Sequence, residues 1–261
     1  MSDAAVLLEG AEVRLHGRVL LGPVDLRIEH GEHWAILGPN GGGKTTLLSL
    51  IGAWRQPSQG RVAVLGARLG RTDVRALRRR IGHVSHHVAD RLRPSMTVMD
   101  AVLAGRVFAL ETWWQDLGGA DREAAEAALE QVGCAELAER RIGTMSLGER
   151  ARVLIARALV GDPELLLFDE PAAGLDLPAR ERLLQAMRAA SRRPGLAASI
   201  VTTHHLEEIP VTVSHAALLR EGAVVAAGPV DEVLATEPLS ACFGMEVVVH
   251  RRDDRWWGRA G

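Results

Sequence analysis

Apolar residues follow two different spacings along the chain, and the change between them outlines a fold. Near the start, short apolar runs are broken by glycine, as in AVLLEGAEVRL and GPVDLRIEHGEHWAILG. Such runs predict β-strands, and the run from His33 to Leu37 predicts a buried strand that ends at Gly38. The segment GKTTLLSLIGAW has helical periodicity, so a strand–loop–helix unit is expected here.

Strands and helices continue to alternate after this unit. GRVAVLG, IGHVS, PELLLFDEP and AASIVTTHH predict strands, while TDVRALRRR, capped by Thr72 or Asp73, and PARERLLQAMRAAS predict helices. AALLREGAVVAAG predicts a hairpin that turns at Glu221-Gly222, VDEVLATE predicts a helix, and the tail 240–261 predicts one strand, MEVVVHRR, and an exposed end. The alternation predicts an α/β fold with a mainly parallel sheet that is covered on both faces.

Between about residues 89 and 143 the pattern becomes helical only. SMTVMDAVLAGR and DREAAEAALEQVGCAELAER are rich in alanine and carry no strand pattern. This stretch therefore predicts a helical insert within the α/β domain.

Composition narrows the class of protein. The chain has 261 residues, of which 47% are hydrophobic, enough for one large domain or two small ones. A net charge of −2 gives no overall basic field, so nucleic acid is not an expected partner, and the run of arginines at 75 and 78–80 is interpreted as a solvated helix face.

Cys134 and Cys242 lie outside any CxxC pattern, which speaks against a zinc site or a disulfide framework and for reduced thiols. No run approaches the ~18 apolar residues of a membrane span, and the apolar run in MSDAAVLLEG is shorter than is expected of a signal peptide.

The loop after the first buried strand has the pattern of a phosphate-binding site. GPNGGGKTT fits G-x-x-x-x-G-K-[ST], with a strand before it and a helix after it. Its glycines let backbone N–H groups point at phosphate oxygens, Lys44 would reach the β- and γ-phosphates, and the Thr45 hydroxyl would bind Mg²⁺. The alternative is a glycine-rich turn with a solvent-facing lysine, which both flanks disfavour. The candidate nucleotide-binding residues are Gly38, Pro39, Asn40, Gly41, Gly42, Gly43, Lys44, Thr45 and Thr46.

Two carboxylates end the buried run LLLFDEP. Ligands in open α/β sheets bind at the carboxyl ends of strands, where Asp169 and Glu170 are expected. Asp169 is a candidate to support Mg²⁺, and Glu170 is a candidate general base that polarises the attacking water. The alternative is a pair of helix-capping acids, which the glycine-rich loop disfavours for both residues together.

TMSLGER marks the start of a helix. Ser146 and Glu149 have the spacing of a capping box, in which each side chain bonds the backbone N–H of the other residue. The free N–H groups of a helix start can also bind an anion. Local sequence leaves both interpretations open.

The motifs GPNGGGKTT, MSLGERARVLIARAL, LLLFDEPAAGLD and VTTHH stand in one order, and together they resemble the ATP-binding cassette (ABC) family of ATPases. The resemblance covers roughly residues 6–234. It implies a P-loop NTPase with a RecA-like parallel-sheet core, a small antiparallel β subdomain and an inserted α-helical subdomain. The ATPase domain is expected over 5–240, with a core lobe of about 5–88 and 146–238, a helical subdomain of about 89–145, and a C-terminal extension over 241–261.

The resemblance also implies the function. A chain of this kind binds ATP and Mg²⁺, hydrolyses ATP, and pairs head to tail, as a homodimer or with another cassette, around two ATP molecules. It drives solute transport through a separate integral-membrane permease, from the cytoplasm and on the inner face of the membrane, and Trp113 and Trp114 are candidate docking residues. A soluble ABC ATPase is the alternative: a single cassette argues against a translation factor and the lack of heptads against a DNA-repair protein, whereas cluster assembly stays open. A catalytically dead cassette is disfavoured because Lys44, Asp169 and Glu170 are all present.

In the signature helix, Ser146 and Gly148 match the family's S-G-G-Q, whereas Leu147 and Glu149 depart from it. The resemblance implies that Ser146 and Gly148 contact the γ-phosphate of the partner's nucleotide. Glu149 is expected to fold back onto the Ser146 backbone, which would leave the serine hydroxyl free, and Arg150 is expected to offset the added charge.

Other positions are carried over by motif alone. AAGLD resembles the D-loop, with Asp176 near the nucleotide, and His204 resembles the switch histidine, with His205 as the adjacent alternative. His86 occupies the Q-loop glutamine position, which implies contact with Mg²⁺ and the attacking water, and His87 is the alternative in a shifted loop. The chain has no tyrosine to stack on adenine, and His16 falls at that position if a one-residue gap is allowed.

Overall fold

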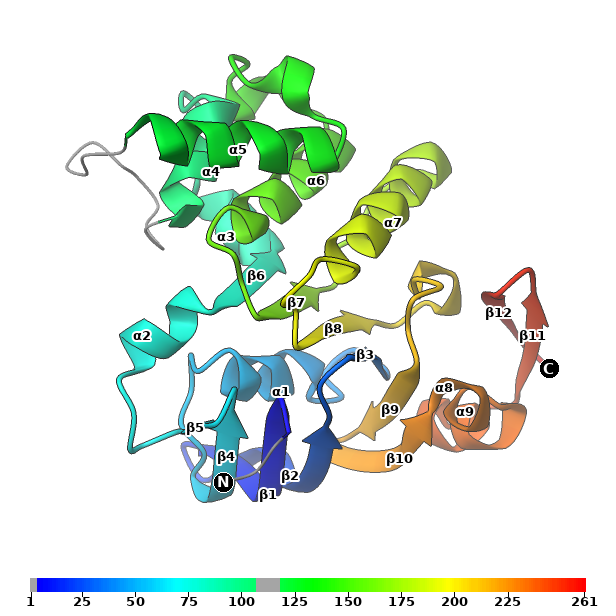
Figure 1. The fold of residues 1–261 in the computed structure, drawn as a ribbon. Coiled ribbons are helices and arrows are strands. Elements are labelled where there is room, and N and C mark those ends of the chain that lie inside the picture. Colours follow the sequence, from blue (N-terminus) through cyan, green and yellow to red (C-terminus); the bar gives the residue numbers. More distant parts are fainter. Residues whose placement is uncertain (1–3, 107–117) are drawn as a thin grey trace. The chain divides into compact units, whose positions relative to one another are not determined.

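The computed structural model describes residues 4–106 and 118–261 of the chain (Figure 1). These residues form two compact units. Unit 1 comprises Met1–Leu77 and Ala197–Gly261, and unit 2 comprises Arg78–Leu196. Helix α2 (Val74–Arg79) crosses the boundary between them, and the Asp73 side chain accepts from the Arg75 N–H at 2.9 Å at its start.

Unit 1 contains an antiparallel sheet with the strand order β2-β1-β4-β5 (Figure 1). Its strands are β1 (Val6–Leu15), β2 (Arg18–Ile28), β4 (Gln59–Val64) and β5 (Ala67–Arg68). The turn from β1 to β2 is made by His16 at φ 49° and Gly17 at φ 78°, the left-handed pair of a two-residue hairpin turn. This sheet is the small antiparallel β subdomain that the resemblance implies.

The other strands of unit 1 are mainly parallel and buried. Strand β3 (Glu32–Leu37) lies between β8 (Ala198–Thr203) and β9 (His215–Arg220) and runs parallel to both. Strand β10 (Ala223–Pro229) is antiparallel to β9, and the predicted Glu221-Gly222 turn joins them. The continuous burial of β8 agrees with a strand that is covered on both faces.

Unit 1 also contains helices α1 (Lys44–Ile51), α8 (Val230–Val233) and α9 (Thr236–Phe243) and the short 3-10 turn η3 (Leu206–Glu208). The segment VDEVLATE was expected to form one helix, but α8 stops at Val233 and the chain turns before α9 begins. Leu234 and Leu239 are buried on either side of this turn.

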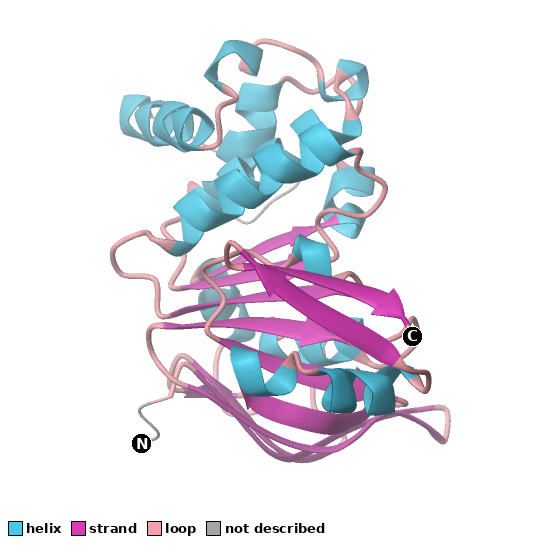
Figure 2. Cartoon of the chain, turned by 90° about the vertical axis from the view of Figure 1, so that its right-hand side faces the viewer, coloured by secondary structure: helices cyan, strands magenta, loops and turns pink. Residues whose placement is uncertain are grey.

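The C-terminal tail corrects one sequence prediction. It forms a hairpin of two strands, β11 (Val247–Arg252) and β12 (Arg255–Ala260), rather than one strand and an exposed end (Figure 2). Asp253 and Asp254, at φ 51° and 58°, make the left-handed turn that sends the chain back. Trp256 is only 8% exposed, and the Arg251 guanidinium lies 5.0 Å from the centroid of its ring. Burial of this indole gives the second strand a reason to form.

Unit 2 is built on two parallel strands, β6 (Ile81–Ser85) and β7 (Leu165–Asp169). Its helices are α3 (His86–Arg91), α4 (Val98–Arg106), α5 (Gly119–Gln131), α6 (Leu147–Leu159) and α7 (Leu177–Ser191), with 3-10 turns η1 (Ala135–Leu137) and η2 (Ile142–Thr144). The described part of the alanine-rich stretch is helical, as its pattern predicts. Trp113 and Trp114 lie outside the described residues.

Candidate functional site

The glycine-rich loop lies between β3 and α1, as its flanking patterns predict. Gly38 and Gly43 have φ angles of 152° and 106°, and Gly41 has 77°. A Cβ atom on Gly38 would lie 1.9 Å from the carbonyl oxygen of Leu219, so only glycine lets the loop approach β9. The sequence therefore needs its glycines here for backbone reasons alone, and the curl they allow is the one that points N–H groups inward.

Lys44 is the first residue of α1 and is only 4% exposed. Its Nζ atom donates to the carbonyl oxygens of Gly38 at 2.9 Å and Pro39 at 3.2 Å. The lysine therefore closes over its own loop rather than facing solvent, which removes the solvent-facing alternative. Thr45, one residue later, is exposed at the first turn of the helix.

His204 follows the end of β8, and the pairing register places it beside the glycine loop. Leu37 pairs with Thr203 in parallel strands, so Gly38 and His204 leave neighbouring strands at the same edge. The His204 and His205 rings are 4.1 Å apart, and His204 is the less exposed of the two. This placement favours His204 over His205 as the residue of the site.

His16 lies at the exposed tip of the β1–β2 hairpin. Leu15 and Val19, beside it, are 43% and 46% exposed, which is unusual for large apolar side chains. Sequence analysis singled out His16 alone and missed this apolar pair, although the run RLHGRVLL contains it. The hairpin tip thus exposes an imidazole and two aliphatic side chains.

In unit 2, Asp169 ends β7 and Glu170 follows it, both half-buried. Glu170 has φ 46°, the left-handed region that a residue with a Cβ rarely adopts. Such backbone strain persists only where the surrounding structure imposes it, and it concentrates at functional sites. The strand therefore presents its second carboxylate in a conformation that a helix-capping role would not require.

His86 and the two carboxylates come from neighbouring strand ends. Ser85 pairs with Asp169, and His86 is the first residue of α3, which Ser85 caps by accepting from the Val88 N–H at 3.4 Å. A cavity of about 40 Å³, large enough for water, lies against His86. Its other lining residues are Val84, Ser85, Ala89, Asp90, Leu147, Arg150, Ala151, Leu154 and Pro171.

The capping box at the start of α6 is present. Glu149 N–H donates to Ser146 Oγ at 3.3 Å, and Ser146 N–H donates to Glu149 Oε2 at 2.8 Å. The expectation of a free serine hydroxyl is wrong, because Ser146 Oγ also donates to Glu149 Oε2 at 2.9 Å. The amide and the hydroxyl share one carboxylate oxygen.

Arg150 does not offset the charge of Glu149, contrary to expectation. Its Nη2 atom donates to the Ile142 carbonyl at 3.3 Å, whereas Arg140 Nη1 donates to Glu149 Oε1 at 3.0 Å. Arg140 was not predicted from the sequence, because this residue lies nine positions before Glu149 and only the η2 turn brings it close to the Glu149 carboxylate. The pKa of Glu149 is lowered, mainly by the backbone hydrogen bond from Ser146, so this carboxyl stays ionised.

Two further motif residues have structural partners. A Cβ atom on Gly148 would lie 2.7 Å from Ala179 Cβ, so this glycine permits the close approach of α6 and α7. Asp176 caps α7 by accepting from the Ala179 N–H at 2.9 Å. Both residues therefore have a packing role, whether or not a nucleotide binds near them.

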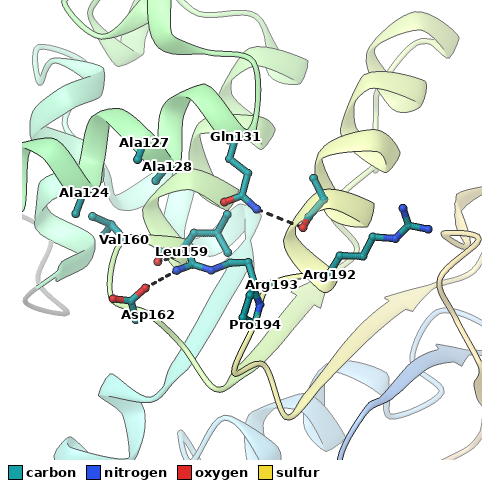
Figure 3. Close-up of a pocket in the computed structure, with 11 residues that line it drawn as sticks. Ala124, Ala127, Ala128, Gln131, Leu159, Val160, Asp162, Arg192, Arg193 and Pro194 are labelled. Atoms are coloured by element: carbon teal, nitrogen blue, oxygen red, sulfur yellow. Dashed lines mark hydrogen bonds and ion pairs between the residues drawn. The ribbon is translucent and has the colours of Figure 1, made fainter.

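A larger cavity in unit 2, of about 470 Å³, is separate from these motifs (Figure 3). Gln131 spans it by donating to the Ala189 carbonyl at 3.2 Å, and Arg193 pairs with Asp162 at its rim. Its lining residues are Ala124, Ala127, Ala128, Gln131, Leu159, Val160, Asp162, Ala189, Arg192, Arg193 and Pro194. Its charged groups are already paired or point outward, so we assign no ligand to it.

Two searches of residues 4–106 and 118–261 limit other kinds of site. No helix in these ranges is long and apolar enough to cross a membrane. The same ranges contain no group of three or more His, Cys, Asp or Glu side chains placed to hold a metal ion.

Comparison with known proteins agrees with this arrangement. The family model described as ABC transporter matches residues 21–173, more than half of the chain. YlmA of Bacillus subtilis (strain 168), an uncharacterized ABC transporter ATP-binding protein, is 36% identical over 95% of this chain and 94% of its own length. The phosphonates import ATP-binding protein PhnC of Alcaligenes faecalis is 37% identical over 85% of this chain and 82% of its own length.

A solved structure extends the likeness to the fold. The ATP-binding cassette MJ0796, in a dimeric post-hydrolysis state bound to ADP and Pi, superposes with a TM-score of 0.73 and 26% identity. The match covers 86% of this chain and 98% of that one. These likenesses confirm the expected α/β P-loop NTPase fold. The chain therefore belongs to the ABC transporter family, as an ATP-binding and ATP-hydrolysing subunit that works in a dimer to drive transport through a separate membrane permease.

Proposed function

We propose that the residues of the glycine loop bind the triphosphate of ATP, with Lys44 on the β- and γ-phosphates and His204 on the γ-phosphate. The observation that carries this proposal is the position of the buried Lys44 ammonium, which now bonds two loop carbonyls beside the end of β8. Because an ammonium has three hydrogens and no acceptor, it can exchange these neutral partners for phosphate oxygens. Phosphate oxygens are the stronger acceptors.

The two carboxylates at the end of β7 are proposed to catalyse the hydrolysis of ATP. Glu170 is proposed as the general base that takes a proton from the attacking water, and Asp169 is proposed as the acidic partner that supports Mg²⁺. His86, from the neighbouring strand end, is proposed to bond that water. The strained backbone of Glu170 supports this division, since a positive φ at a residue with a Cβ atom is concentrated at functional sites.

Mg²⁺ is the cation that fits these residues. The exposed Thr45 hydroxyl and the half-buried Asp169 carboxylate are hard oxygen ligands, and His86 is the third candidate. When bound, Mg²⁺ neutralises charge that develops on the phosphates. The sparse set of protein ligands suits this ion, which keeps several waters and is bound largely by substrate phosphates.

We further propose a head-to-tail homodimer on the inner face of the membrane, in which Ser146 and Gly148 of one chain bind the nucleotide of the other and Asp176 lies near it. Leu147, at the start of α6, is exposed, as an interface residue should be. Each chain of this dimer is proposed to have a core lobe of residues 5–88 and 146–238, a helical subdomain of residues 89–145 and a C-terminal extension of residues 241–261. The hairpin tip at His16, with its exposed aliphatic neighbours, is proposed to contact the base.

The test is a pair of variants of the purified chain. Lys44→Ala should lose ATP binding, measured by equilibrium dialysis with labelled ATP. Glu170→Gln should bind ATP and form an ATP-dependent dimer, seen by light scattering, without turnover. A Glu170→Gln protein that hydrolyses ATP at the wild-type rate would remove Glu170 from the role of base. GTP assayed beside ATP tests the base contact.

A further inference from the structure

The hydroxyl of the signature serine is already in use. Ser146 Oγ donates its hydrogen to Glu149 Oε2 at 2.9 Å, and the same carboxylate oxygen accepts from the Ser146 N–H at 2.8 Å. A serine hydroxyl has one hydrogen to donate. While this bond is made, Ser146 can offer a γ-phosphate only lone pairs, which a phosphate oxygen does not bind.

A second side chain holds the carboxylate in this position. Arg140 Nη1 donates to Glu149 Oε1 at 3.0 Å, and Arg140 Nη2 donates to the Thr144 carbonyl at 2.8 Å. The guanidinium thereby joins the loop before α6 to the outer oxygen of Glu149, while the inner oxygen faces Ser146. The Glu149 side chain is 25% exposed, so its charge is only partly screened by water.

We propose that Glu149 gates the signature serine, and that Arg140 is the positioning residue which holds Glu149 over the serine hydroxyl and offsets its charge. The proposal rests on the proposed role of Ser146 in binding the partner's nucleotide. Closing the dimer on ATP then requires the hydroxyl to rotate from Glu149 Oε2 to the phosphate. The carboxylate and the γ-phosphate compete for one hydrogen.

A glutamine at position 149 would act in the opposite sense. Its Oε1 atom can still accept from the Ser146 N–H, as the carboxylate oxygen does, but a neutral amide oxygen is a weaker acceptor for the serine hydrogen, which is then given more readily to the phosphate. Glutamine also removes a negative charge that faces an anion. Glu149→Gln should therefore favour the closed dimer. Arg140→Ala should disfavour it, because the carboxylate keeps its two hydrogen bonds from Ser146, accepts the serine hydrogen more strongly without its counter-charge, and repels the phosphate.

The experiment measures the ATP concentration at half-maximal dimerisation in a Glu170→Gln background, where turnover does not deplete the nucleotide. We expect Glu149→Gln to lower this midpoint about three- to tenfold, the scale of the net contribution of one ordinary hydrogen bond. We expect Arg140→Ala to raise it by a similar factor, and Arg140→Lys to recover part of the loss. Arg141→Ala, which removes the neighbouring exposed cation, is the matched control and should leave the midpoint unchanged.

A double-mutant cycle separates gating from a direct contact of Arg140 with phosphate. Combined with Glu149→Gln, Arg140→Ala should change the midpoint less than about twofold, because the charge that it offsets is gone. An equal effect of Arg140→Ala in both backgrounds would overturn its positioning role. An unchanged midpoint in Glu149→Gln would overturn the gating role of Glu149 but not the proposed contact of Ser146 with the partner's nucleotide. If the Glu170→Gln parent forms no dimer with ATP, the proposed contact of Ser146 with the partner's nucleotide is wrong, and so is the gating role of Glu149.

Discussion

The Arg80 guanidinium and the Glu164 carboxylate join the starts of the two parallel strands of unit 2. Arg80 Nε donates to Glu164 Oε1 at 2.6 Å, and Nη2 donates to Oε2 at 2.7 Å. The Glu164 N–H also donates to the Arg80 carbonyl at 2.8 Å. Arg80 therefore does not belong to a solvated helix face, as its sequence neighbours suggest. The pair sets the register that places Ser85 beside Asp169 at the other ends of these strands.

Arg80→Ala should lower the free energy of unfolding by about 1 kcal/mol, the upper range for an exposed ion pair with two-point geometry. The value is small because the two side chains are 39% and 43% exposed, so water screens the pair. Urea denaturation measures the change. Arg79→Ala, which removes an exposed arginine one position earlier, is the matched control and should be nearly neutral. Equal losses of unfolding free energy in both variants would show that the Arg80–Glu164 pair does not contribute to stability.

Ser146→Arg should abolish ATP hydrolysis while ATP binding persists. The proposed clamp acts on the partner's nucleotide, so a bulky cation at position 146 blocks closing of the dimer and leaves the chain's own glycine loop intact. Steady-state ATPase rates and equilibrium dialysis with labelled ATP measure the two effects. A variant that hydrolyses ATP at more than about one tenth of the wild-type rate would contradict a clamp at Ser146.

ATPase activity should fall more steeply on acidification in the wild-type protein than in His86→Gln. A protonated imidazole has no lone pair for a metal or a water hydrogen, whereas glutamine keeps its acceptor at every pH. Asp90 and Arg150, the charged residues that line the same cavity, are present in both proteins. Superimposable pH profiles would remove His86 from the reaction.

The C-terminal hairpin should depend on close packing against the rest of unit 1. A Cβ atom on Gly258 would lie 2.7 Å from Leu206 Cδ1, and Arg255 Nη2 donates to the Glu207 carbonyl at 3.1 Å. Gly258→Val should therefore release the hairpin, seen as faster proteolysis after Arg255 and faster hydrogen exchange in β12. Gly119→Val, where nothing lies within 4 Å of an added Cβ atom, is the control. Unchanged exchange in β12 of Gly258→Val would show that the hairpin holds without this contact.

Cys134 should resist alkylation in the folded protein. Burial raises the pKa of its thiol from 9.0 to about 11, so the thiolate fraction at pH 8 is about 100-fold below that of the unfolded chain. Because the thiol ionises less readily when folded, stability should be lost as the pH rises from 9.0 towards 11. Iodoacetamide labelling with and without urea measures the protection. Equal labelling rates in the two conditions would contradict the burial of this thiol.

Local patterns in the sequence determined much of the fold. The GPNGGGKTT loop between a buried strand and a helix, the Ser146–Glu149 capping box and the Glu221-Gly222 turn each depend on residues within a few positions of one another. Backbone conformation at such spacings follows from residue type, since glycine permits positive φ and serine caps helices. These elements could be predicted from sequence, and the structure contains them.

Tertiary structure alone decided what lies beside these elements. The pairing of Leu37 with Thr203 brings His204 to the glycine loop from 166 positions away, and the η2 turn carries Arg140, rather than Arg150, to Glu149. The second strand of the tail forms because Trp256 finds a surface to bury it. Such contacts depend on strand register and on packing between distant segments, which no local spacing encodes. Sequence thus supplied the residues of the candidate site, and only the folded chain determined which of their hydrogen bonds are already taken.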